Sequence, residues 1–147
     1  MRLLLAALAL IAHQASAGTA SVLASLDQLK WQSRIIAINA STNGHSANPG
    51  NIESYKSTLK AYKSLIEDRD IVWLVVTSDA ITSNFPGSVT GNVRTEIQAL
   101  TTTDGTSVVL IGKDGTVKDK SNTLDLESLF GLIDTMPMRI NEMQSKR

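Results

Sequence analysis

The chain has 147 residues, no Cys, two His, and a formal net charge of zero from 14 basic and 14 acidic residues. Without Cys, a disulfide, a thiolate nucleophile, a CxxC redox pair, a Cys-ligated zinc and an iron–sulfur cluster are all excluded. The balanced charge argues against broad nucleic-acid binding. The hydrophobic fraction of 42% is that of an ordinary globular chain, and the length predicts a single domain.

Residues 1–17 have the pattern of a cleavable signal peptide. A positive start at Met1-Arg2 precedes an apolar stretch, Leu3 to Ala12, that is too short to span a bilayer. Ala15-Ser16-Ala17 is a small-x-small cleavage site. We therefore predict cleavage after Ala17 and a periplasmic or secreted mature chain, 18–147, with no membrane span. An uncleaved membrane anchor is the alternative, which the short apolar stretch disfavours.

The first half of the mature chain predicts helix, strand, loop and helix in that order. Ser21 to Leu29 has apolar residues at helical spacing, which predicts a short amphipathic helix leading to Trp31. Arg34 to Asn39 (RIIAIN) is apolar and β-branched, which predicts a strand. A polar loop, Ala40 to Asn51, follows. The next helix has Asn51 as a plausible N-cap and an apolar stripe at steps of three and four: Ile52, Tyr55, Leu59, Tyr62 and Ile66.

A second strand and a second loop come next. Ile71 to Val76 (IVWLVV) is an unbroken apolar run, typical of a strand covered on both faces. We interpret Trp31 and Trp73 as packing residues. Ser78 to Asn92 contains Asn, Pro and Gly and is predicted to be a long loop. A short helix is predicted after it from Val93, Ile97 and Leu100.

The C-terminal part predicts a hairpin and a final helix. Thr106 to Ile111 is a strand, Lys113-Asp114-Gly115 a tight turn, and Thr116 to Lys118 the partner strand. Pro137 either stops the last helix or restarts a second one as its first residue. That helix has an apolar face made of Leu126, Leu129, Phe130, Ile133 and Met136.

The element order is helix, β-α-β, helix, β-β-α. A helical crossover joins the first two strands, so they should be parallel, and a tight turn joins the last two, so they should be antiparallel. This order predicts an α/β domain with a mixed four-stranded sheet and helices on both faces, the thioredoxin-like arrangement. Other small α/β sandwiches remain open alternatives.

The loop from Ala40 to Asn51 lies where a thioredoxin-like domain has its chemistry, at the start of the first long helix. It offers Ser41, His45 and Ser46, which form an alternative site of a base and a hydroxyl nucleophile. A polar surface loop is the simpler interpretation. The helix start could also bind an anion without a thiol.

Metal binding has little support, since His45 would be the single mature histidine. The acidic residues Glu67, Asp68 and Asp70 flank Arg69 at a helix-to-strand junction, and we interpret them as solvated charge. We predict no metal and no cofactor.

Several motifs in a fixed order resemble one family. They are LDQLKW (Leu26 to Trp31) before a strand, the EDRD junction (Glu67 to Asp70), VVLIGKDGTVK (Val108 to Lys118), and LFGLIDTMPMR (Leu129 to Arg139) followed by Glu142-Met143. The chain resembles the P-DUDES domain of unknown function, found in small exported bacterial proteins and in animal sushi-repeat-containing matrix proteins. The resemblance implies a thioredoxin-like fold. Ile140 departs from the family pattern, in which a second Arg is frequent.

We therefore predict a binding module of the cell envelope without catalytic residues, whose partner is a protein or a small anionic ligand and not a nucleic acid. The alternative is an enzyme, a thiol-independent oxidoreductase or hydrolase that uses the Ser41–His45 loop, and self-association is a third possibility. The predicted partner surface consists of Lys113, Asp114, Gly115, Asp134, Met138 and Arg139.

Overall fold

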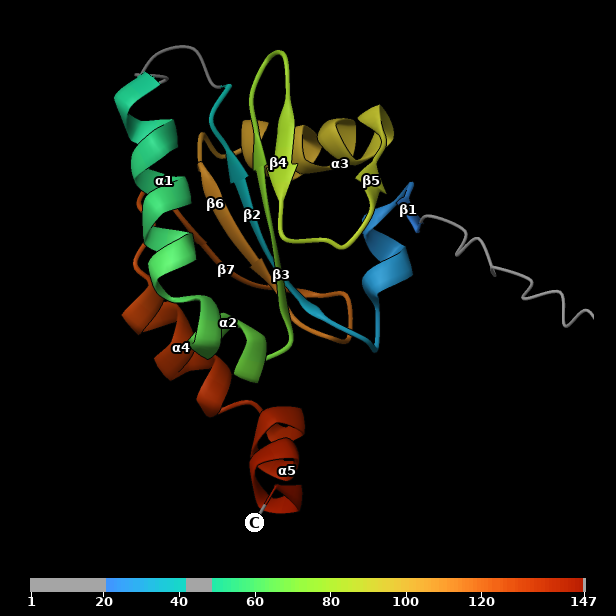
Figure 1. Ribbon diagram of the computed structural model, residues 1–147, viewed down its shortest axis with the longest axis vertical. Coiled ribbons are helices and arrows are strands. Elements are labelled where there is room, and N and C mark those ends of the chain that lie inside the picture. The colour runs from blue at the N-terminus through green and yellow to red at the C-terminus, as the bar shows by residue number, and fades with distance from the viewer. Residues whose placement is uncertain (1–20, 42–48, 147) are drawn as a thin grey trace, which may run out of the picture.

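The computed structural model describes residues 21–41 and 49–146, and a five-stranded mixed sheet lies at its centre (Figure 1). The spatial order of its strands is β4-β3-β2-β6-β7. A second, two-stranded parallel sheet joins β1 (Val22–Leu23) to β5 (Ser88–Val89). The strands of the main sheet are β2 (Arg34–Asn39), β3 (Ile71–Val76), β4 (Ile81–Ser83), β6 (Val108–Ile111) and β7 (Val117–Ser121).

The pairings confirm the expected strand directions. β2 is parallel to β3, with Ile36 opposite Trp73, and antiparallel to β6, with Ile36 opposite Leu110. β6 and β7 are antiparallel around the Gly-containing turn. All six residues of β2 are buried, and β2 is also the middle strand of the sheet, between β3 and β6.

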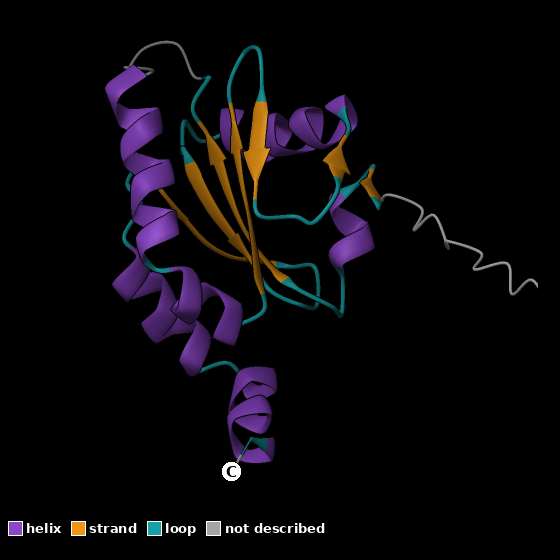
Figure 2. Ribbon diagram, in the orientation of Figure 1, coloured by secondary structure: helices purple, strands orange, loops and turns teal. Residues whose placement is uncertain are grey.

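Helices cover both faces of the sheet (Figure 2). On one face α1 (Pro49–Ala61), α2 (Lys63–Asp68) and α4 (Leu126–Asp134) pack around Ile36 and Ile38. On the other face α3 (Gly91–Thr102) and the 3-10 helix η1 (Leu26–Leu29) pack around Ile35 and Ala37. The alternation of strand side chains thus divides the core into two layers. The last helix, α5 (Pro137–Ser145), lies at one end of the molecule (Figure 1).

The prediction of four strands in the sheet was wrong, because part of the predicted loop Ser78–Asn92 folds back against β3 as β4. The polar residue Asn84 extends this edge with its side chain. Its Oδ1 accepts from the Trp73 backbone N–H at 2.7 Å, and its Nδ2 donates to the Ile71 carbonyl at 3.0 Å. A residue type that favours turns therefore takes the place of a paired strand residue.

The predicted helix from Ser21 to Leu29 was also wrong in type. Its first part forms β1, and only Leu26–Leu29 is helical, as a single 3-10 segment. Ser25 begins that segment with a capping box, in which the Gln28 side chain returns to the backbone N–H of Ser25. Trp31, expected to pack, is 63% exposed and has a positive φ of 65°. Trp73, by contrast, is buried as predicted.

The long apolar stripe was predicted well, but its helix was not continuous. Leu59 and Ile66 are buried in the core, and Ile52, Tyr55 and Tyr62 pack against it. The helix breaks at Tyr62 into α1 and α2. It begins at Pro49, so Asn51 lies inside the first turn and is not the N-cap.

At the other end of the chain, Pro137 restarts a helix as the first residue of α5, one of the two predicted alternatives. Within the ranges 21–41 and 49–146, no helix is both long enough and apolar enough to cross a bilayer.

Candidate functional site

The strongest candidate site is a hollow between the β6–β7 turn and the junction of α4 with α5. Its volume is about 240 Å³. We call it the corner hollow and define it by its lining: Arg34, Gly112, Lys113, Asp114, Lys118, Met136, Pro137 and Met138. Two of the motifs found in the sequence, GKDG and MPM, therefore face each other across it.

The turn that forms one wall is held tightly. Gly115 has a φ of 78°, a left-handed conformation that side chains other than Gly resist. The Asp114 carboxylate accepts from the Thr116 backbone N–H at 3.1 Å and pairs with Lys118 Nζ at 2.7 Å. The Lys118 hydrogen bond lowers the pKa of Asp114 to about 2, with support from Thr116. Asp114 is therefore a carboxylate at any ordinary pH.

Lys113 connects the turn to two other segments. Its Nζ lies 2.8 Å from Asp70 Oδ2 and 2.8 Å from Glu142 Oε1. Its carbonyl accepts from the Trp31 backbone N–H at 2.6 Å. That contact fixes the backbone of the exposed Trp31 beside the turn, in its left-handed conformation.

Arg34 opens the buried strand β2 and is only 1% exposed. Its guanidinium forms two hydrogen bonds to the Glu142 carboxylate, at 3.1 and 3.2 Å, and a third to the Arg69 carbonyl at 2.8 Å. Partial burial raises the pKa of Glu142, but hydrogen bonds from Lys113 and Arg34 outweigh that effect and the net pKa is lowered. Glu142 is thereby held ionised between two cations.

Arg139 docks α5 against α2 and α4. It is 3% exposed, and within α5, a segment that the structure describes in full, it is the one buried residue. Its Nε bonds Asp134 Oδ1 at 3.0 Å, its Nη1 bonds the Asp68 carbonyl at 2.8 Å, and its Nη2 bonds the Asp68 carboxylate. Hydrogen bonds from Lys146 and Arg139 lower the pKa of Asp68 to about 2.

Ion pairs therefore hold α5 against the rest of the fold, whereas most helices are held by an apolar face packed on the core. We call the set formed by Arg34, Asp68, Arg69, Asp70, Lys113, Asp134, Arg139, Glu142 and Lys146 the charge network. The interpretation of Glu67, Asp68 and Asp70 as solvated charge holds for their exposure, since their side chains are 57%, 44% and 49% exposed, but it missed the ion pairs at this junction. Asp68, Arg69 and Asp70 each pair with a residue distant in sequence.

The predicted partner-surface residues lie in three places. Lys113, Asp114 and Met138 meet at the corner hollow, and Met138 is 38% exposed. Asp134 and Arg139 lie in the charge network, which Lys113 and Arg34 connect to the hollow, and Gly115 lies on the opposite side of the turn, against the Lys30 side chain.

Sequence reasoning missed Arg34, Glu142 and Lys118 as members of this region. The signal for Arg34 was a charged residue directly before the apolar run Ile35–Ile38 of a predicted strand.

The alternative site lies at the other end of β2. Ser41 Oγ donates to Asn39 Oδ1 at 2.5 Å and accepts from Gln98 Nε2 at 3.4 Å. Asn39 is itself buried and donates to Thr101 Oγ1 at 2.7 Å. An amide oxygen is too weak a base to activate a hydroxyl, so these contacts hold Ser41 in place at the end of β2. His45 and Ser46 lie outside the described residues.

Among the residues that the structure describes, no group of three or more His, Asp or Glu side chains is placed to hold a metal ion. The acidic side chains of the charge network are all engaged by Arg or Lys.

The fold and the corner hollow define an α/β domain with a mixed sheet whose last helix is docked by charge. Residues 25–142 match the profile of a domain of unknown function, DUF4174, and the chain belongs to that family. Comparisons with curated proteins and with solved structures gave no significant match.

Proposed function

We propose that this protein is an exported, thioredoxin-like binding module of the P-DUDES type, which engages a partner through the corner hollow and uses no catalytic thiol. The observation that carries the proposal is the convergence of the strand β2, the GKDG turn and the MPM junction around one hollow. These segments are far apart in sequence, and the hollow is assembled only in the folded chain.

The strand order supports the thioredoxin-like part of the proposal. Without the edge strand β4, the sheet reads β3-β2-β6-β7, with one parallel pair and two antiparallel pairs. That is the arrangement expected from β-α-β followed by β-β-α. The chain has no Cys to place at the start of the first long helix, which argues for binding over thiol chemistry.

The chemistry of the hollow favours a protein partner over a small anion. The cations that line it already have carboxylate partners: Lys113 pairs with Asp70 and Glu142, and Lys118 pairs with Asp114. An anion would have to displace one of them. Met138 is the exposed, adaptable apolar group at the rim, and methionine surfaces suit contact with protein side chains.

The proposed export rests on the pattern of residues 1–17, which lie outside the described part. Expression in a bacterium with a C-terminal tag tests it. We expect the tagged chain in the periplasmic fraction with Gly18 as its first residue. Recovery of uncleaved chain in the cytoplasm would contradict export.

The binding surface is tested with Met138→Gln, and Ile140→Gln serves as the matched control. Both residues lie on α5 and are 38% and 39% exposed, but they are two positions apart and so face different directions. Proteins from the native envelope are passed over each immobilised variant. We expect Met138→Gln to lose a partner that wild type and Ile140→Gln retain. Equal retention by all three would contradict the assignment of the corner hollow.

A further inference from the structure

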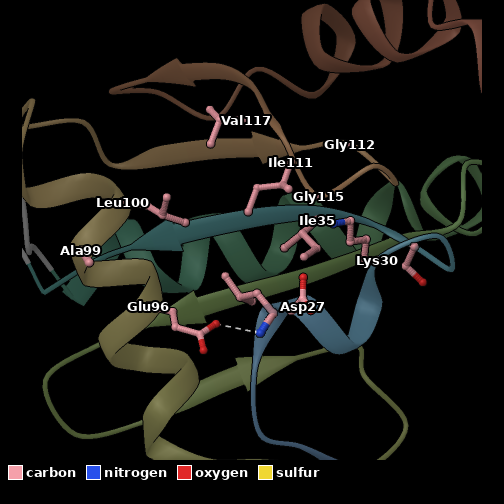
Figure 3. Close-up of a pocket in the computed structure, with 12 residues that line it drawn as sticks. Asp27, Lys30, Ile35, Glu96, Ala99, Leu100, Ile111, Gly112, Gly115 and Val117 are labelled. Atoms are coloured by element: carbon pink, nitrogen blue, oxygen red, sulfur yellow. Dashed lines mark hydrogen bonds between the residues drawn. The ribbon is translucent and has the colours of Figure 1, made fainter.

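A second and larger hollow lies on the opposite face of the sheet (Figure 3). Its volume is about 400 Å³, within the ~300–1,000 Å³ of typical small-molecule sites. The sheet residues Ile35, Ile111 and Val117 form its floor, and η1 and α3 form its two walls. The glycines of the GKDG turn close one end, so that turn separates this hollow from the corner hollow. We call it the sheet hollow.

The interior of the sheet hollow is apolar. Leu26 from η1 and Leu100 from α3 add to the floor residues, and Figure 3 shows Leu100, Ile111 and Ile35 gathered between α3, η1 and the hairpin. Val117 on the edge strand is 41% exposed. The apolar surface here is thus concave and partly open, the form expected for an apolar ligand.

Three charged residues lie at the rim: Asp27, Lys30 and Glu96. The Glu96 carboxylate is already engaged, because it accepts from the Leu26 backbone N–H at 2.7 Å and from Asn92 Nδ2 at 3.0 Å. The stem of Lys30 lies against Gly115, with its Cδ 3.3 Å from the position a Cβ would occupy there. Figure 3 shows Lys30 at the end of the hollow next to this glycine.

Among the residues that the structure describes, Lys30 forms no ion pair, and its ammonium lies over the Trp31 ring, 5.9 Å from the centroid. Lys30 is exposed and is the one cation among the residues that line the hollow, so it is the group that an anionic head group on an apolar body would meet, between the two negative charges of Asp27 and Glu96. We propose that the sheet hollow binds a small amphipathic carboxylate, with its chain over Ile35, Ile111 and Leu100 and its head group at Lys30. This inference stands on residues apart from Met138 and does not require the proposed partner surface.

The two carboxylates at the rim, Asp27 and Glu96, make the proposal testable by charge. The two uncharged donors to Glu96 fix its position and leave its charge in place, and Asp27, three residues before Lys30, adds a second negative charge at the rim. Removal of the Asp27 charge should therefore strengthen the binding of an anion and weaken that of a cation. Removal of the Lys30 charge should do the opposite.

The test uses anilinonaphthalene sulfonate as a fluorescent probe of the purified protein, displaced by decanoate or by decylamine. We expect one saturable probe site, displacement by decanoate, and much weaker displacement by decylamine. Lys30→Gln should weaken decanoate binding about fivefold, the upper range for an exposed charge pair. Asp27→Asn should strengthen it about twofold, and Lys60→Gln on α1 should leave it unchanged.

A variant that fills the hollow locates the site. Ala99 is an exposed lining residue on α3, so Ala99→Phe adds volume there without disturbing the core. It should abolish decanoate binding, whereas Ala61→Phe, at the exposed end of α1, should not. Equal displacement by decylamine, or unchanged binding in both Lys30→Gln and Ala99→Phe, would overturn the proposal. Loss of binding in Met138→Gln would show that the probe occupies the corner hollow instead.

Discussion

The two ends of β2 are both polar and both buried, yet they are stabilised in opposite ways. At its start, Arg34 is 1% exposed and is held by the Glu142 carboxylate and a backbone carbonyl. At its end, Asn39 is 2% exposed and bonds Thr101 and Ser41, all uncharged. Through the charge network the charged end is linked to α2, the β6–β7 turn, α4 and α5, whereas the Asn39 side chain at the neutral end is linked to Ser41 and to α3.

The difference between the two ends of β2 shows what charged contacts do in this fold that neutral ones do not. An ion pair in a partly buried place is strongly directional, and removal of one partner leaves the other uncompensated. The charge network can therefore position α5 and the MPM junction without an apolar face on α5. At the neutral end, the backbone N–H and the hydroxyl of Ser41 both donate to Asn39 Oδ1, so this hydroxyl is engaged in a structural contact.

The largest effect should come from Arg34→Met, which removes the cation at the charged end. Glu142 and the Arg69 carbonyl would lose their shared donor, and we expect a loss of about 3 kcal/mol in the free energy of unfolding. Denaturant titration measures it. Lys63→Met, which breaks the exposed pair with Glu67, should cost less than ~0.5 kcal/mol. Similar costs for the two would remove the distinction between buried and exposed pairs.

The neutral end is tested by Thr101→Val, a change that keeps the shape and removes the hydroxyl. The Asn39 amide would lose its acceptor in a buried place, so we expect a loss of about 1–2 kcal/mol. Thermal and denaturant unfolding both report it. Thr102→Val, at the exposed neighbouring position, is the control. If Thr101→Val leaves the free energy of unfolding unchanged, the Asn39–Thr101 hydrogen bond does not stabilise the fold beyond the packing of the two side chains.

The turn between the two hollows gives a smaller effect of known sign. Gly115→Ala places a Cβ in a left-handed conformation, which should cost about 1 kcal/mol. Gly131→Ala, inside α4 with open space around it, should instead stabilise by about 0.5–1 kcal/mol. Unfolding midpoints of the two variants should thus move in opposite directions. A shift of the same sign in both would mean that the turn is not held in this conformation.

The smallest effect is the dependence of stability on pH. The folded pKa of Asp68 lies below its ordinary value, so its contribution is present above pH 3.8 and disappears as the pH falls toward about 2. Its side chain is 44% exposed, and water therefore weakens the effect. Unfolding curves at several pH values should lose stability in that window for wild type and less steeply for Asp68→Asn. Equal slopes would mean that Asp68 does not carry the dependence.

Periodicity and runs of apolar residues predicted much of the fold, since burial dictates them. IVWLVV became the buried β3, and the stripe from Ile52 to Ile66 packs on the core. The edge strand β4 could not be predicted, because Ile81–Ser83 is short and its pairing is completed by the side chain of Asn84. β1 and η1 depend on a partner strand and a capping box that override the local helical spacing.

The candidate site was likewise predictable only where it depends on local sequence. The two motifs GKDG and MPM were found in the sequence, and the structure brings them to one hollow. Their relation to Arg34 and Glu142 could not be predicted, because it depends on contacts between residues 108 positions apart. Whether Lys113, Asp114 and Met138 bind a partner stays a prediction.

The central claim is that the charge network holds α5 in place, and native-state hydrogen exchange tests it most directly. At neutral pH the backbone amides of α5 should be protected in wild type. In Glu142→Gln they should exchange about tenfold faster, equivalent to ~1.4 kcal/mol, and no amide of β3 should lose more protection than that. Unprotected α5 amides in wild type, or no change in Glu142→Gln, would contradict the account.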